Sequence, residues 1–291
     1  MPRSNNRFLT YFLLLISASI WGVSTPIIKY SFQFIEPLPF LFFRYLFASL
    51  LFIPIFLVYK AKKKQRINHF QTLLVALIGT PFCLIPLYAG INLTSSLEAS
   101  LLDATSPLFT VILCVFFLKE KLSKKELKGL LIAVSGTLMI VLEPLLRGSH
   151  QASISSVEGN LLILLGALIW SFFLFFSKKL KINPTYLSFY SFVISIPFFY
   201  VASVSTGSSL TLSPLALPGV LFMSIAGSII AFWTYQEGQK RIEASEAVVF
   251  SYLKPIFAIP LSIMWLKDAF SPIAIIATIF IALGVYISET R

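Results

Sequence analysis

Polar residues recur at helical spacing inside an apolar segment, EASLLDATSPLFTVILCVFFLKE, which runs from Glu98 to Glu120. Because steps of three or four residues return to the same side of a helix, these residues share one face. An acid on such a face costs about 2.5–3.5 kcal/mol at the centre of a membrane helix, so it normally faces a cavity or a charged partner. We therefore expect this face to line a cavity for a polar solute. It consists of Ser100, Asp103, Ser106, Thr110 and Cys114.

A second segment, EAVVFSYLKPIFAIPLSIMWLKD from Glu246 to Asp268, matches the first at a constant offset of 148 residues. Flanking glycines such as Gly136 and Gly284 keep the same offset, which indicates an internal duplication. The polar face returns in the second copy, but there it carries a base in place of the acid. From this copy we expect the cavity to be lined by Ser251, Lys254 and Ser262.

Two alternatives to a cavity stay open for these faces. Small polar residues along a stripe also form close contacts between membrane helices, with no cavity between them. In addition, Asp103 lies about two helical turns from the start of its segment, which is within reach of the outer interface.

A count of depth favours contact between the two charges. At 1.5 Å per residue, Lys254 lies about 13 Å from the cytoplasmic end of its span and Asp103 about 10 Å from the outer end of its own. In a hydrocarbon core about 30 Å thick the two depths differ by only a few ångströms. The sequence therefore predicts that the Lys254 ammonium meets the Asp103 carboxylate or an acidic group of a substrate.

Equivalent prolines interrupt both segments, Pro107 in the first and Pro255 in the second. Proline removes a backbone donor and breaks or kinks a helix. In membrane proteins such breaks free backbone groups to line a cavity or provide a hinge. We interpret both prolines as helix-break or hinge positions.

The remaining charged residues have two possible roles each. Arg44, in FLFFRYLF, either reaches the outer interface with its long side chain or anchors a substrate carboxylate in the cavity. Lys29 and Lys178 end their apolar segments and are expected to be interfacial anchors. Glu98 and Glu246 lie in the first helical turn, where a carboxylate stabilises the positive end of the helix dipole, with a role in gating or coupling as the alternative.

A group of aromatic residues in the first, third and eighth apolar segments completes the candidate cavity. Aromatic side chains also gather at membrane interfaces, so this signal is weak by itself. The group consists of Trp21, Tyr88, Trp233 and Tyr235.

Composition places all these residues in a membrane protein. The chain has 291 residues, of which 57% are hydrophobic and 12% charged, about half the charged fraction of a soluble protein. Its apolar residues form blocks of about 20, the length that crosses a bilayer as a helix. We predict an all-α integral membrane protein with ten transmembrane helices, near residues 8–29, 37–59, 70–90, 96–118, 124–142, 158–177, 184–203, 215–236, 245–266 and 271–288.

The basic residues orient these ten spans. With a cytoplasmic N-terminus, 18 of the 23 Lys and Arg residues fall on the inside and three on the outside, as the positive-inside rule requires. Both termini are then cytoplasmic. Each repeat has five spans, so the second copy starts from the opposite side, as in inverted-repeat transporters. The predicted organisation is a first repeat at 1–146, a polar linker at 147–157 and a second repeat at 158–291.

Trp21 with Lys29 recurs as Trp170 with Lys178, and the proline-containing segments end in LKE and LKD. In these features nearly the whole chain resembles the EamA-type branch of the drug/metabolite transporter superfamily. The resemblance implies ten helices around a central cavity, and export or exchange of small metabolites through the cell membrane. The second copy departs from the pattern with Ser171, where the first has Gly22.

The expected function is therefore secondary active transport of small organic metabolites, such as amino acids or related compounds. The alternative is a lipid-handling or structural membrane protein that lacks a solute pathway. The sequence has no HExxH, GxSxG or Walker motif, so we expect no enzyme activity. We expect no cofactor, metal or nucleic-acid partner, and we expect only the solute and the lipid bilayer as partners. No feature of the sequence indicates an oligomeric state.

Overall fold

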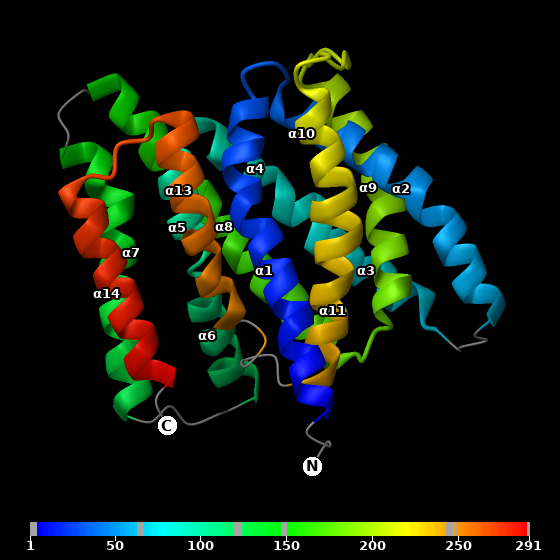
Figure 1. Ribbon diagram of the computed structural model, residues 1–291, viewed down its shortest axis with the longest axis horizontal. Coiled ribbons are helices and arrows are strands. Elements are labelled where there is room, and N and C mark those ends of the chain that lie inside the picture. The colour runs from blue at the N-terminus through cyan, green and yellow to red at the C-terminus, as the bar shows by residue number, and fades with distance from the viewer. Residues whose placement is uncertain are drawn as a thin grey trace.

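The computed structural model describes residues 5–62, 67–118, 124–146, 150–242, 247 and 249–289, and every regular element among them is a helix (Figure 1). Within these residues six helices are long and apolar enough to cross a membrane, and two shorter apolar helices follow them near the C-terminus. The fold class is thus all-helical, as predicted. The count of ten spans stays a prediction.

Each apolar block of the sequence falls in a helical stretch. The first repeat contains α1 (Asn5–Ser31), α2 (Pro37–Lys62), α3 (His69–Leu77), η1 (Ile78–Phe82), α4 (Cys83–Leu93), α5 (Ser96–Asp103), α6 (Ser106–Leu118) and α7 (Lys124–Leu146). The second contains α8 (His150–Lys179), α9 (Pro184–Ser205), α10 (Leu217–Phe222), η2 (Met223–Ile230), α11 (Ala231–Arg241), η3 (Val249–Leu253), α13 (Lys254–Leu266) and α14 (Pro272–Glu289).

The third helical stretch of each repeat contains a π-helical insertion. In the first repeat it is η1, between α3 and α4, and in the second it is η2, between α10 and α11. At the 148-residue offset, Gly79 in η1 and Gly227 in η2 are equivalent residues of the two repeats. Such insertions widen a helix and leave backbone carbonyls available for other donors.

The proline-containing stretches are broken at equivalent places. In the first repeat α5 ends at Asp103 and α6 begins at Ser106, just before Pro107. In the second, the 3-10 turn η3 leads into α13 one residue before Pro255. Segment α5 packs on α13, and α6 packs on η3, so the two broken stretches cross near their breaks. Each of the two prolines therefore lies beside the end of one helical segment and the start of the next, and their role as hinges stays a prediction.

Helices α7 and α14, which are equivalent in the two repeats, lie side by side at one edge of the molecule (Figure 1). A methyl group added at Gly136 would lie 2.7 Å from the backbone oxygen of Ala277 on α14. One added at Gly284 would lie 2.6 Å from the backbone oxygen of Gly129 on α7. These approaches are possible only without a side chain, which explains why the glycine is present in both copies.

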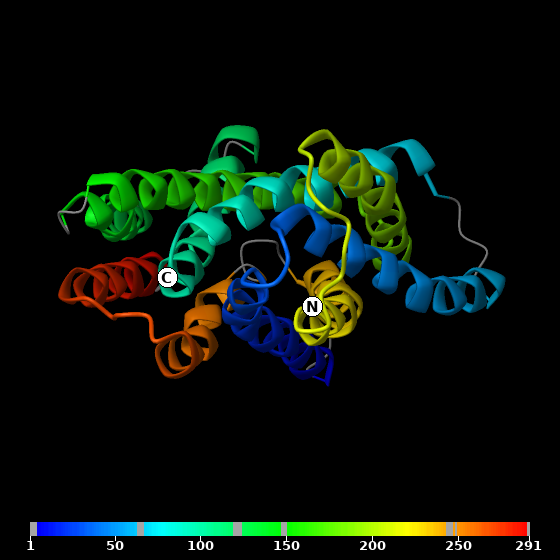
Figure 2. The same cartoon turned by 90° about the horizontal axis from the view of Figure 1, so that it is seen from above.

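The helices form two layers when the molecule is seen from above. Figure 2 shows α8 along one side of the molecule and α1, α11, α13 and α14 on the other. Side chains that face away from the other helices are large and apolar, including Leu50 and Leu57 on α2 and Leu283 on α14. Such surfaces suit a lipid environment, and with the long apolar helices they make this a multi-pass membrane protein.

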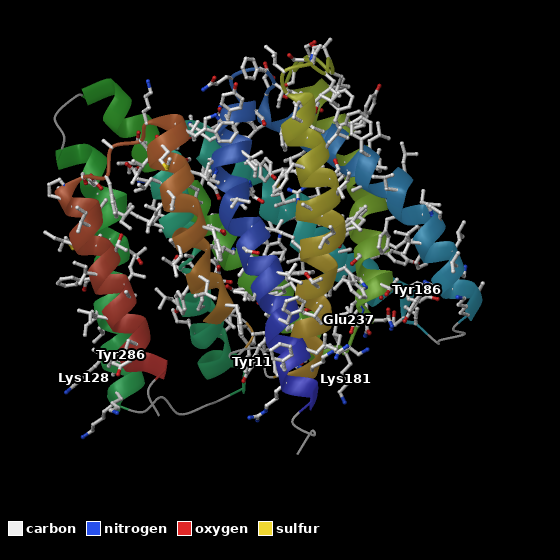
Figure 3. The ribbon with its side chains drawn as sticks, viewed as in Figure 1. Tyr11, Lys128, Lys181, Tyr186, Glu237 and Tyr286 are labelled. Atoms are coloured by element: carbon white, nitrogen blue, oxygen red, sulfur yellow. The ribbon has the colours of Figure 1, made fainter. Side chains whose placement is uncertain are left out.

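The first and last helices begin and end at the same side of the molecule, the lower side in Figure 1. The basic residues Lys128 and Lys181 lie on that side too, as the labels in Figure 3 show. The predicted linker is partly helical, since α8 already begins at His150. Residues 150–157 therefore extend the first helix of the second repeat toward the first repeat.

Candidate functional site

A cavity of about 80 Å³ lies where the broken helices cross. Its walls come from α1, α2, η1, α4 and α5 of the first repeat and from α8, η2, α11 and α13 of the second. The volume is enough for several water molecules or a small solute. Among the residues that the sequence predicts to line a cavity, those found in this lining are Trp21, Arg44, Tyr88, Asp103 and Lys254.

The two predicted mid-membrane charges form an ion pair in the wall of this cavity. Lys254 Nζ donates to Asp103 Oδ2 at 2.7 Å. Asp103 is the last residue of α5 and Lys254 the first residue of α13, so the pair joins the two helix breaks. The side chains keep 19% and 8% of their surface exposed, which leaves the carboxylate partly accessible from the cavity.

The surroundings of Lys254 are fixed by close helix contacts. Its ammonium lies 5.5 Å from the centre of the Trp21 ring, at cation–π distance. A methyl group added at Gly22 would lie 2.7 Å from the Lys254 backbone oxygen, so α1 approaches α13 closely there. In the second repeat the equivalent of Gly22 is Ser171, whose hydroxyl donates to the Ser106 backbone oxygen at 2.9 Å. The sequence difference at this position therefore exchanges a close contact for a hydrogen bond.

Arg44 is held inside the bundle, with only 5% of its surface exposed, and does not extend to a membrane interface. Its Nε donates to Ser228 Oγ at 2.8 Å, and its Nη1 donates to the Tyr88 hydroxyl. The guanidinium carbon lies 5.0 Å from the centre of the Tyr45 ring. Within the described residues no carboxylate forms an ion pair with Arg44.

Three aromatic rings, which we call the aromatic cluster, pack edge-on or tilted against one another at one side of the cavity. Trp21 and Trp170, equivalent residues of the two repeats, have ring centres 5.5 Å apart, and Tyr235 lies 5.3 Å from Trp21. The Trp21 indole donates to the Gly227 backbone oxygen at 3.0 Å, a carbonyl within the π-helical insertion η2. The two tryptophans line the cavity, whereas Tyr235 packs behind them.

The remaining predicted residues lie outside this lining and contact other helices or their own backbone. Ser262 bonds to Ser96 across the α5–α13 contact, and Trp233 donates to Thr185. Ser100, Ser106 and Thr110 donate to backbone oxygens three or four residues earlier in their own stretch. Those outside the lining are Ser100, Ser106, Thr110, Trp233, Tyr235, Ser251 and Ser262.

Several lining residues were not predicted from the sequence. Ser24 and Thr25 follow Trp21 by one helical turn, so the helical period could have identified them. Trp170 could have been found as the repeat equivalent of Trp21. Nothing in the local sequence marks Met223 or Phe232, which reach the cavity only through the packing of η2 and α11.

The comparisons with known proteins agree with this architecture. Both halves of the chain, residues 8–142 and 157–290, match the EamA-like transporter family. The chain belongs to this family. It is therefore a transport protein by descent, and each family match covers one of the two repeats.

Curated relatives of this EamA-like protein match over most of their length. A Bacillus subtilis (strain 168) protein described as the uncharacterized transporter YyaM is 25% identical over 88% of this chain and 86% of its own. An Escherichia coli (strain K12) protein described as a probable amino-acid metabolite efflux pump is 24% identical over 95% and 93%. A solved crystal structure with 19% identity superposes with a TM-score of 0.71 over 97% of this chain and 98% of that one, which shows the shared fold.

Two lysines of this EamA-like protein cap equivalent helices at opposite ends of the molecule. Lys29 Nζ, near the end of α1, donates to the backbone oxygens of Ile91 and Asn92 at the end of α4. Lys178 Nζ, near the end of α8, donates to those of Gln239 and Lys240 and also to Ile242 at the end of α11. A cation at a helix C-terminus satisfies open carbonyls and opposes the helix dipole. Both lysines are thus helix caps, a more specific role than the interfacial anchoring expected.

Replacing either capping lysine with methionine is expected to lower thermal stability. Hydrogen bonds to a charged group contribute about 1.5–3 kcal/mol each, so Lys29→Met and Lys178→Met should each lower the Tm by roughly 5–10 °C in detergent. Lys128→Met, which removes an exposed lysine on α7, is the matched control and should change the Tm by less than about 2 °C. Equal Tm values for all three variants would contradict the capping role.

Glu98 belongs to a buried network instead of lying free in the first turn. Ser95 caps α5 by accepting from the Glu98 amide, and the Glu98 carboxylate accepts from Thr94 at 2.6 Å and from Asn160 of α8 at 3.1 Å. Asp268 accepts from the Ser96 hydroxyl and the Leu97 amide, so it caps α5 and forms no ion pair with Lys267. Glu246, Lys119, Glu120 and the Cys114 side chain lie outside the described residues.

Proposed function

We propose that this protein is a secondary active transporter of small organic metabolites, such as amino acids or related compounds, in the cell membrane. It works by alternating access between two inverted five-helix repeats. One observation carries the proposal: the cavity lies at the crossing of two broken helices, and its ion pair takes one charge from each repeat. A site built at the repeat interface is a common arrangement in secondary transporters.

Equivalent contacts in the two halves support the inverted repeat. Three features recur at an offset of 148 or 149 residues. They are the π-helical insertions η1 and η2, the breaks before Pro107 and Pro255, and the caps by Lys29 and Lys178. The caps lie at opposite ends of the molecule because α1 and α8 run in opposite directions (Figure 1). An odd number of spans per repeat produces this reversal, and ten spans in total return the chain to the side on which it began.

The inferred orientation places both chain ends and the labelled residues Lys128 and Lys181 in the cytoplasm (Figure 3). Reporter fusions at positions 65 and 152 test this topology, because they should report opposite sides of the membrane. If both report the same side, the inverted repeat is wrong.

The relatives' names and the cavity together suggest the substrate class. A probable amino-acid metabolite efflux pump is among the relatives that match over nearly the full chain. The cavity of about 80 Å³ combines an arginine and an ion pair with aromatic and aliphatic walls. These groups suit a small solute with one polar end and one apolar end.

Uptake and exchange in proteoliposomes test the proposal directly, and labelling of cysteines separates it from a structural or lipid-handling role. In a background without Cys83 and Cys114, Thr25→Cys faces the cavity, while Ala277→Cys is buried between α7 and α14. A small polar thiol reagent should label the first and not the second. If neither cysteine is labelled and no metabolite tested is exchanged, the results would favour the alternative, a lipid-handling or structural membrane protein without a solute pathway.

Restoring the missing backbone donor at either helix break is expected to slow exchange. In Pro107→Ala the new amide can compete with the Ser106 hydroxyl, which now donates to the Asp103 backbone oxygen at 2.7 Å, and α5 and α6 become one helix. Pro255→Ala should act likewise on η3 and α13. We expect exchange to be slower by about threefold to tenfold, with membrane insertion retained.

The matched control for the proline variants is Pro54→Ala, at an exposed proline inside α2. It removes a proline from a helix that is not broken, and it should leave the rate unchanged. Wild-type exchange rates in both Pro107→Ala and Pro255→Ala would mean that these prolines only pack.

A further inference from the structure

The charges in the cavity wall do not balance. Among the described lining residues the ionised groups are Arg44, Lys254 and Asp103. The second and third form an ion pair at 2.7 Å and cancel each other. Arg44 is left with an uncompensated positive charge, and its side chain is buried. Glu98, the other acid on α5, is outside the lining and is already held by Thr94 and Asn160.

The contacts of Arg44 orient its charge without neutralising it. Ser228 and Tyr88 accept hydrogen bonds from Nε and Nη1, and the Tyr45 and Tyr88 rings lie 5.0 and 5.8 Å from the guanidinium carbon. These partners are neutral, so they contribute dipoles and π-electrons but no counter-charge. Arginine has five N–H donors, of which these bonds use two. The remaining donors can bind a carboxylate of a solute.

An uncompensated charge inside a membrane protein normally marks a substrate or ion site. A solute with one net negative charge would bring the cavity to neutrality. A zwitterion would bind the same groups but leave the excess positive charge in place. Apart from Ser24, Thr25 and the tyrosines, the rest of the wall is mostly apolar. Trp170, Met223 and Phe232 form the second-repeat part of it, so the solute also needs a hydrocarbon portion.

We infer that the cavity selects organic monoanions, with the solute carboxylate bound by Arg44 and its hydrocarbon portion against the aromatic and aliphatic wall. This inference rests on the proposed transport function and narrows it. A 2-hydroxy acid is bound in preference to the zwitterionic amino acid of the same skeleton. The Lys254–Asp103 ion pair stays intact when the solute binds. The net charge that the solute must balance is therefore the single positive charge of Arg44.

The test uses full-length purified protein and solutes that differ only in charge. For an isobutyl and a benzyl skeleton these are the 2-hydroxy acid, the amino acid, the amine and the substituted malonate, with charges from −1 to 0, +1 and −2 at pH 7.5. Binding is followed by tryptophan fluorescence, since Trp21 and Trp170 line the cavity. Uptake is followed in proteoliposomes, with protein-free liposomes as the measure of passive entry.

Wild-type protein should bind the hydroxy acid at least about tenfold more tightly than the amino acid. Arg44→Gln should abolish this preference, whereas Arg44→Lys, which keeps the charge, should retain it at lower affinity. Asp103→Asn raises the net charge by one and should shift the preference by about tenfold toward the malonate. Arg241→Gln, at a partly exposed arginine paired with Glu237 on α11, is the control and should keep the wild-type ranking.

Three results overturn the inference, and they separate its failure from that of the proposed function. If wild-type protein takes up the amino acid or the amine more readily than the hydroxy acid, transport stands and monoanion selection is wrong. The same conclusion follows if Arg44→Gln and Asp103→Asn both keep the wild-type charge ranking. If no solute of either skeleton binds or enters above the protein-free rate, the cavity is not an anion site and the proposed function fails with it.

Discussion

Lys254→Met is expected to abolish transport, with a loss of about 100-fold or more, while the protein still inserts and folds. The substitution keeps the length and apolar stem of the side chain, and the close approach of Gly22 to the backbone of residue 254 is preserved. What it removes is the ammonium that bonds to Asp103 at 2.7 Å and lies over the Trp21 ring. The Asp103 carboxylate is then left without its partner at the junction of the two repeats.

Breaking a fully buried ion pair costs about 3–5 kcal/mol. The cost here is smaller because the Asp103 side chain keeps 19% of its surface exposed to the cavity. The fold therefore survives, but each conformation of the transport cycle must now hold an unmatched carboxylate near the middle of the membrane. Since the pair joins α5 to α13, its loss also removes the contact that couples the two breaks.

Three further variants separate charge from position. Lys254→Arg should rescue poorly, because a planar guanidinium cannot occupy the compact site under Trp21. Asp103→Asn should give a partial defect, since it keeps an oxygen that can accept from Lys254. Lys267→Met removes an exposed lysine at the end of α13 and should have no effect. The measurement is exchange in proteoliposomes at several pH values, and wild-type rates for Lys254→Met would mean that this lysine only packs.

The duplication predicted the centre of the site, where the two repeats meet. Alignment at an offset of 148 placed the two prolines in equivalent positions, and the structure has a helix break beside each. The same alignment, combined with the rise of a helix, brought Lys254 and Asp103 to similar depth, and they are in contact. Helical geometry fixes depth well because the rise per residue hardly varies.

Rotation about the helix axis was much harder to predict than depth. Ser251 shares a face with Lys254 in the sequence pattern, but the change from the 3-10 turn η3 to α13 alters the phase of that face. A period of 3.6 residues assumes an unbroken helix, and the break lies between Ser251 and Lys254. The partners of Arg44 were hidden for a similar reason, because Ser228 lies within the π-helical insertion η2.

Asp268→Ala is expected to favour the state that is open to the outside. Asp268 follows α13 at the end that the proposed orientation places outside, and its Oδ2 accepts from the Ser96 hydroxyl at 2.9 Å and from the Leu97 amide at 3.0 Å. Ser96 also bonds to Ser262 at 2.6 Å, so three polar contacts close this end of the α5–α13 contact. Both Ser96 and Leu97 are fully buried beneath them. For the cavity to open outward between the two repeats, these contacts have to separate.

Each hydrogen bond to the carboxylate contributes about 1.5–3 kcal/mol, and 1.4 kcal/mol changes an equilibrium constant tenfold. Loss of both bonds should therefore raise the outward-open population by at least about tenfold. The readout is labelling of Thr25→Cys, in a background without Cys83 and Cys114, by a thiol reagent that cannot cross the membrane and is added outside. Labelling should accelerate by about tenfold while exchange slows, because the return step now has to rebuild a weakened contact.

Two control variants are compared by the same labelling rate. The rate for Asp268→Asn, which keeps one acceptor oxygen, should lie between that of the parent protein and that of Asp268→Ala. Lys267→Ala should be labelled at the rate of the parent protein. An unchanged labelling rate in Asp268→Ala would show that the repeats part elsewhere, and that Asp268 serves only to cap α5.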